Sequence, residues 1–126
     1  MNKRLQSLPG AKRFEAFDAL ARREQLLPIK VPPFYAQKVR EEVEALGHSD
    51  GPLYRCVLPT KERMQLHAPG EVADFVDDRH NMPEMAPDTI VRKYKNRLLF
   101  FPTDVCAGHC QYCFRQDLLS EKGATH

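Results

Sequence analysis

Residues 98–115 read LLFFPTDVCAGHCQYCFR, and the rest of the chain is best interpreted from this stretch. Its first four residues are an apolar run that Pro102 ends, which is typical of a strand buried on both faces. A loop with Cys106, Cys110 and Cys113 follows, and residues 114–122 are predicted to be helical. The order strand, ligand loop, helix predicts an α/β fold, in which the loops after strands carry the chemistry.

The three loop cysteines have the spacing C-x3-C-x2-C, which suits an iron–sulfur cluster or zinc. A [4Fe-4S] cluster held by three cysteines keeps one iron open to another molecule. Structural zinc needs a fourth ligand from elsewhere, because His109 stands directly beside Cys110. A redox pair of Cys110 and Cys113 leaves Cys106 unexplained. Buried free cysteines are the remaining alternative, and the spacing favours the iron–sulfur cluster.

Composition limits the classes of partner. The chain has 126 residues, the size of one ordinary domain, with 19 basic and 17 acidic residues. This balance gives no argument for binding nucleic acid or an anionic membrane surface. No apolar run approaches the ~20 residues that span a bilayer, and the N-terminus lacks a secretory apolar core. We therefore expect a cytoplasmic protein with no nucleic-acid or membrane partner, in which thiols stay reduced.

The residues before the cysteines predict short helices and irregular links. Apolar residues recur at helical spacing over 11–26 and 34–46, which predicts two amphipathic helices. The apolar faces of these helices pack either in the core or against another subunit, so a homo-oligomer remains one alternative. Residues 53–58 predict a strand or extended piece, and Thr60 caps a helical turn at 61–65. Residues 69–88 predict an irregular strap, and 90–94 and 98–101 predict two strands joined by a turn.

With these motifs in place, the chain resembles the radical S-adenosylmethionine (radical SAM) enzymes. The three cysteines follow an apolar strand, and the residue before the last one, Tyr112, is aromatic, as is usual in that superfamily. Residues 94–106, YKNRLLFFPTDVC, resemble the lysine 2,3-aminomutase family more narrowly. Residues 33–35, 57–60 and 74–88 are also similar to that family's N-terminal region, so the resemblance covers about residues 25–116.

The resemblance implies three cofactors. Cys106, Cys110 and Cys113 would bind a [4Fe-4S] cluster, whose open iron would be chelated by S-adenosyl-L-methionine. An electron donor would reduce the cluster, and cleavage of the sulfonium would give a 5′-deoxyadenosyl radical. In the family that radical abstracts hydrogen from an amino acid held on pyridoxal 5′-phosphate, and an amino group moves from carbon 2 to carbon 3. Tyr112 would lie against the adenine, and the substrate would be a small, lysine-like amino acid.

The resemblance also implies a division of the chain. Residues 1–88 would be an N-terminal helical and irregular extension, and residues 89–126 the start of a partial (β/α) radical-SAM barrel. The chain stops 13 residues after Cys113, whereas a full α/β barrel takes roughly 200–250 residues. The pyridoxal-phosphate lysine and the other catalytic residues would then lie outside this chain. We expect an N-terminal piece that is inactive alone, with a non-catalytic zinc- or iron–sulfur-binding module as the alternative.

Overall fold

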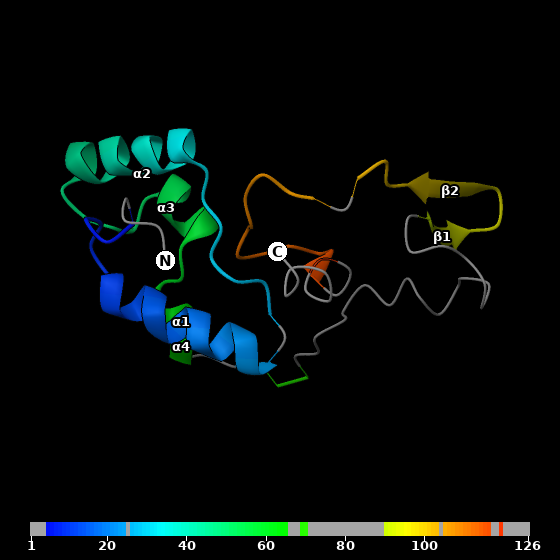
Figure 1. The fold of residues 1–126 in the computed structure, drawn as a ribbon, viewed down its shortest axis with the longest axis horizontal. Coiled ribbons are helices and arrows are strands. Elements are labelled where there is room, and N and C mark those ends of the chain that lie inside the picture. Colours follow the sequence, from blue (N-terminus) through cyan, green and yellow to red (C-terminus); the bar gives the residue numbers. More distant parts are fainter. Residues whose placement is uncertain are drawn as a thin grey trace.

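Helices and a hairpin make up the described part of the chain. The computed structural model describes residues 5–24, 26–65, 69–70, 90–103, 105–116 and 119. Its elements are four helices followed by two strands: α1 (Ala11–Glu24), α2 (Pro33–Leu46), α3 (Pro52–Val57), α4 (Lys61–Gln65), β1 (Ile90–Tyr94) and β2 (Arg97–Phe100). The helices gather at one end and the hairpin stands at the other, with the orange cysteine loop between them (Figure 1). The predicted α/β class is confirmed, and a barrel unit stays a prediction.

The two predicted amphipathic helices are confirmed. Helix α1 ends at Glu24, close to the predicted end, and buries Phe14, Phe17 and Ala21 from its apolar stripe. Helix α2 begins at Pro33, where a missing N–H costs nothing, and ends at Gly47. Gly47 adopts the left-handed conformation (φ 72°), and its N–H donates to the carbonyl of Val43, as the sequence predicted for a C-terminal cap.

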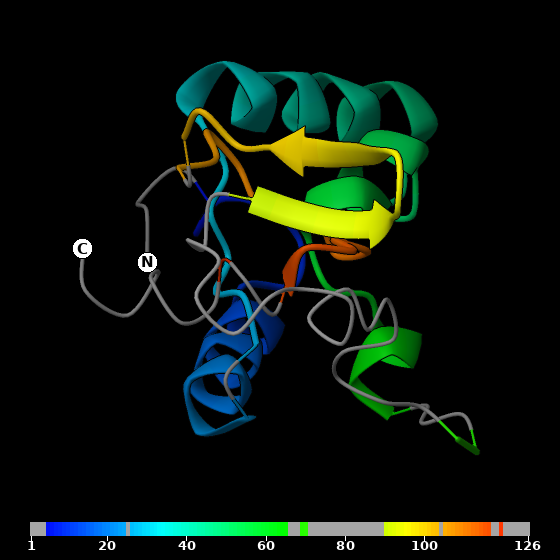
Figure 2. The same cartoon turned by 90° about the vertical axis from the view of Figure 1, so that its right-hand side faces the viewer.

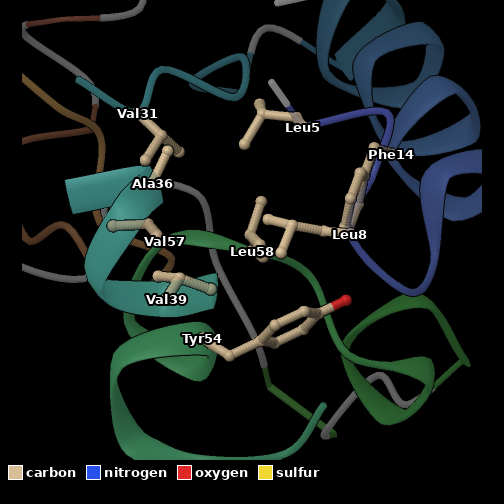
Figure 3. Packing of buried hydrophobic residues seen from close by; sticks show 9 residues of the cluster. All are labelled: Leu5, Leu8, Phe14, Val31, Ala36, Val39, Tyr54, Val57 and Leu58. Atoms are coloured by element: carbon tan, nitrogen blue, oxygen red, sulfur yellow. The ribbon is translucent and has the colours of Figure 1, made fainter. Parts of the chain in front are cut away.

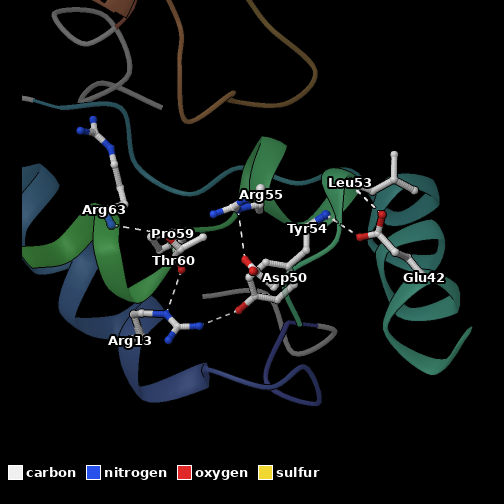
Figure 4. Close-up of polar contacts among 9 residues, drawn as sticks. All are labelled: Arg13, Glu42, Asp50, Leu53, Tyr54, Arg55, Pro59, Thr60 and Arg63. Atoms are coloured by element: carbon white, nitrogen blue, oxygen red, sulfur yellow. Dashed lines mark hydrogen bonds and ion pairs between the residues drawn. The ribbon is translucent and has the colours of Figure 1, made fainter. Parts of the chain in front are cut away.

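The strand predicted over residues 53–58 is wrong, because this segment forms helix α3. Gly51 is extended and precedes Pro52 at the first helical position. The Glu42 carboxylate of α2 accepts hydrogen bonds from the N–H groups of Leu53 and Tyr54, both at 2.8 Å. Figure 4 shows this carboxylate pointing at the first turn of α3. A side chain from another element therefore supplies the cap that the local sequence lacks.

A single apolar cluster joins the N-terminal segment to the helices. Figure 3 shows its side chains converging between α1, α2 and α3. Its buried members are Leu5, Leu8, Phe14, Val31, Ala36, Val39, Tyr54, Val57 and Leu58. The hydroxyl of Tyr54 donates to the carbonyl of Pro9 at 2.7 Å and accepts from Arg13 at 3.0 Å. Arg13 also donates to the carbonyl of Pro59 at 2.8 Å, so the polar atoms at the edge of this core are paired (Figure 4).

A smaller polar contact continues this arrangement into α4. The N–H of Arg63 donates to the hydroxyl of Thr60 at 3.2 Å, which confirms the predicted cap of the turn at Lys61–Gln65. We use the name helical unit for residues 5–65, which hold the core cluster and all four helices.

Strands β1 and β2 form an antiparallel hairpin, as the sequence predicted, but β2 is not buried. Val91 pairs with Leu99 and Ile90 pairs with Phe100. Leu98 and Phe100 are each 60% exposed, so the prediction of a strand covered on both faces is wrong. The reason is that strand burial depends on flanking layers, and within the described residues β1 is the one strand paired with β2. Figure 2 shows the hairpin lengthwise, as two strands side by side.

Several predictions fall outside the described residues. The strap at 69–88 is described at residues 69–70 alone. Of the helix predicted at 114–122, Gln116 and Leu119 are helical, and the N–H of Leu119 donates to the carbonyl of Arg115 at 3.1 Å. No described helix is long and apolar enough to cross a bilayer.

Candidate functional site

The cysteine loop, residues 105–115, lies against the helical unit. Figure 1 shows the orange loop beside the cyan connector that joins α1 to α2. The N–H of His109 donates to the carbonyl of Lys30 in that connector at 2.8 Å. The N–H of Gln111 donates to the carbonyl of Cys56, near the end of α3, also at 2.8 Å. Two parts of the helical unit therefore hold one short loop.

The predicted metal ligands all lie in this loop as thiols outside any disulfide. Cys110 is exposed, and Cys106 and Cys113 are half-buried. Three soft sulfur donors within eight residues fit an iron–sulfur cluster in chemistry, and none of the three is in a disulfide. In this conformation no three His, Cys, Asp or Glu side chains of the described residues are gathered as a ligand group. The assignment of Cys106, Cys110 and Cys113 as metal ligands stays a prediction.

Partial burial and neighbouring thiols both act on the Cys110 thiol. Burial is the main reason that the pKa of the Cys110 thiol is raised, and the nearby thiols of Cys56, Cys113 and Cys106 raise it further. The pKa of Cys110 therefore depends on both of the other predicted ligands and on Cys56 of α3.

Tyr112 presents its ring to solvent while its hydroxyl is held. The ring side chain is 70% exposed, and the hydroxyl lies 3.3 Å from the thiol of Cys56. The hydrogen bond with Cys56 is the main cause that raises the pKa of Tyr112. An exposed aromatic face with a fixed hydroxyl is a suitable surface for stacking a base. Contact between Tyr112 and adenine stays a prediction.

Cys56 is a site residue that the sequence did not reveal, because it lies far from the other three cysteines in the chain. It is half-buried, and its carbonyl and thiol both contact the cysteine loop. The one indication in the sequence that Cys56 belongs to this site is its residue type, since it is the one cysteine outside the loop. Without the position of α3, that signal gives no reason to place it beside Tyr112.

His109 directly precedes Cys110 in the loop, and its side chain contacts the connector. The residue is buried, and its ring nitrogen Nδ1 lies 2.8 Å from the carbonyl oxygen of Pro28. A carbonyl can only accept, so Nδ1 carries the proton of this hydrogen bond. His109 therefore contacts the connector with both its backbone and its side chain.

Arg115 lies among aromatic rings. Its guanidinium carbon is 4.8 Å from the centre of the Phe114 ring and 5.4 Å from that of Phe101. Both distances are typical of cation–π contacts. Arg115 thus joins the end of the cysteine loop to Phe101, the residue that follows β2.

Comparison with known proteins adds a distant relationship. No family model and no solved structure matches the chain. It is 29% identical over 92 residues to an L-lysine 2,3-aminomutase of Haemophilus influenzae, covering 73% of this chain and 25% of the relative. It is 25% identical over 99 residues to an L-lysine 2,3-aminomutase of Methanococcus maripaludis, covering 79% of this chain and 21% of the relative. The chain spans about a quarter of the length of these curated relatives, and it is distantly similar to proteins of that name.

Proposed function

We propose that this chain is the N-terminal, cluster-binding region of a radical S-adenosylmethionine aminomutase. The observation that carries the proposal is the three-thiol loop, present in a chain similar over most of its length to two L-lysine 2,3-aminomutases. Cys106, Cys110 and Cys113 would hold a [4Fe-4S] cluster with one open iron. When bound, the cluster would supply the electron that cleaves S-adenosyl-L-methionine to a carbon radical.

The residues of this chain have definite tasks under the proposal. The three thiols bind iron, and the ring of Tyr112, held through its hydroxyl by Cys56, offers the exposed face for adenine. Hydrogen abstraction and amino-group migration on a lysine-like amino acid, held on pyridoxal 5′-phosphate, would use residues outside this chain. We therefore expect the isolated chain to bind the cluster without catalysing the isomerisation.

A test follows from the number of thiols. The chain is loaded with iron and sulfide without oxygen, and iron, sulfide and the spectrum of the reduced sample are measured with and without S-adenosyl-L-methionine. We expect about four irons per chain and a spectral change when the nucleotide is added. Replacement of any one loop cysteine by serine should remove most of the iron. A chain that takes up no iron under these conditions would contradict the proposal.

One observation favours a second candidate, a structural zinc site. Zinc prefers four tetrahedral ligands, and α3 places the thiol of Cys56 beside the loop, 3.3 Å from the hydroxyl of Tyr112. A fourth thiol is therefore available near the other three. Cys56→Ser separates the candidates, because it should weaken binding at a four-thiolate zinc site and leave a three-thiolate cluster in place. Metal analysis of the purified wild-type chain and this variant gives the answer.

A further inference from the structure

The cysteine loop is attached to the helical unit on both sides of one cysteine. The N–H groups of His109 and Gln111 both donate at 2.8 Å, the first to the carbonyl of Lys30 and the second to that of Cys56. Cys110 stands between these two donors. Its backbone is therefore fixed from both sides by segments that belong to the helical unit. Cys106 and Cys113 lie outside the interval between the two bonds.

The side chain of His109 strengthens one of these attachments. It is 9% exposed, and its Nδ1 donates to the carbonyl of Pro28, two residues before the acceptor of its own N–H. At the preceding position, a Cβ on Gly108 would lie 3.1 Å from Cδ of Pro32 and 3.2 Å from the carbonyl oxygen of Lys30. A side chain at position 108 would therefore fit only if the connector shifted slightly away from the loop.

We propose that the helical unit acts as a template for the cluster site, with His109 as its positioning residue. The template holds the backbone on both sides of Cys110 through the carbonyls of Lys30 and Cys56. This inference rests on the proposed function. His109 positions Cys110 through the backbone, and its own side chain is held by the bond from Nδ1 to the carbonyl of Pro28.

Amide hydrogen exchange of the metal-free 126-residue chain tests the template directly. His109→Ala removes the side-chain bond to Pro28, and we expect the exchange of the His109 and Gln111 amides to become roughly five- to tenfold faster. His109→Asn can place an amide donor near the position of Nδ1 and should restore exchange to within about twofold of wild type. The control is His48→Ala, at an exposed position after α2. If His109 only stabilised the fold, His109→Ala would lower the melting temperature of the helices. We expect this melting temperature to be the same in all three variants.

Iron loading of the same variants connects the template to the cluster. We expect His109→Ala to load iron more slowly than wild type and to give a broader spectrum of the reduced cluster, with both effects reversed in His109→Asn. Equal exchange at His109 and Gln111 in wild type and His109→Ala would overturn the inference, whatever the iron content. A wild-type chain that binds no iron would overturn the proposed function instead, and the exchange data would still report whether Cys110 is held.

Discussion

The cap of α3 makes a strong prediction, because one carboxylate serves two backbone donors. Glu42 accepts from the N–H groups of Leu53 and Tyr54, each at 2.8 Å, and Tyr54 itself belongs to the core cluster. A single side-chain cap contributes ~0.5–2 kcal/mol, and hydrogen bonds to charged groups are at the upper end of the usual range. Glu42 is half-buried, so two such bonds give a loss of about 2–4 kcal/mol for Glu42→Ala.

Urea denaturation followed by circular dichroism measures this loss. Glu42→Gln keeps one carbonyl oxygen and places an amide beside the second donor, so we expect it to fall between wild type and Glu42→Ala. The control is Glu44→Ala, which removes an exposed carboxylate from the same helix and should change the free energy of unfolding by less than ~0.5 kcal/mol. If Glu42→Ala were no more destabilising than Glu44→Ala, the account of why residues 52–57 are helical would be refuted.

Three further outcomes follow from other contacts. Burial is the main cause that raises the pKa of Tyr35, so the folded state holds this proton after the unfolded state has lost it, above pH ~10. The stability linked to this proton is complete below pH 10 and declines above it; urea midpoints at pH 9 and 11 should therefore fall more for wild type than for Tyr35→Phe. Tyr54→Phe removes the 2.7 Å bond to Pro9 and should lower the free energy of unfolding by about 1–2 kcal/mol in the same assay; a change below ~0.3 kcal/mol would contradict this. Phe100→Lys places a charge on an exposed strand, so it should reduce self-association, measured by light scattering, with little loss of stability. Unchanged association would mean that the molecules do not associate through this hairpin.

The parts of the fold that the sequence predicted are those set by local patterns. The period of apolar residues predicted α1 and α2, and Gly47 predicted where α2 ends. The turn between β1 and β2 was likewise visible as two polar residues between apolar runs. In each of these cases the residues that determine the structure lie close to it in the sequence.

The predictions of the fold were wrong where residues distant in the sequence determine the local structure. The six residues of α3 have an apolar pattern that fits a short strand or a helix, and Glu42 on another helix selects the helix. The exposure of Leu98 depends on what covers the hairpin, which its own sequence does not contain. The division of the chain between residues 88 and 89, and the ligand roles of the cysteines, stay predictions.

The attachment of the cysteine loop shows why such a site is hard to find from sequence. The connector holds Pro28 and Pro32, and proline keeps a segment extended and removes its own N–H. An extended segment without a partner strand leaves carbonyl oxygens that still require donors. His109 supplies two of those donors, one to Pro28 and one to Lys30. Because the acceptors are backbone atoms, many residue types at position 30 would serve equally. The residues whose type matters are therefore the prolines, His109 and Gly108, which are too few to form a recognisable pattern.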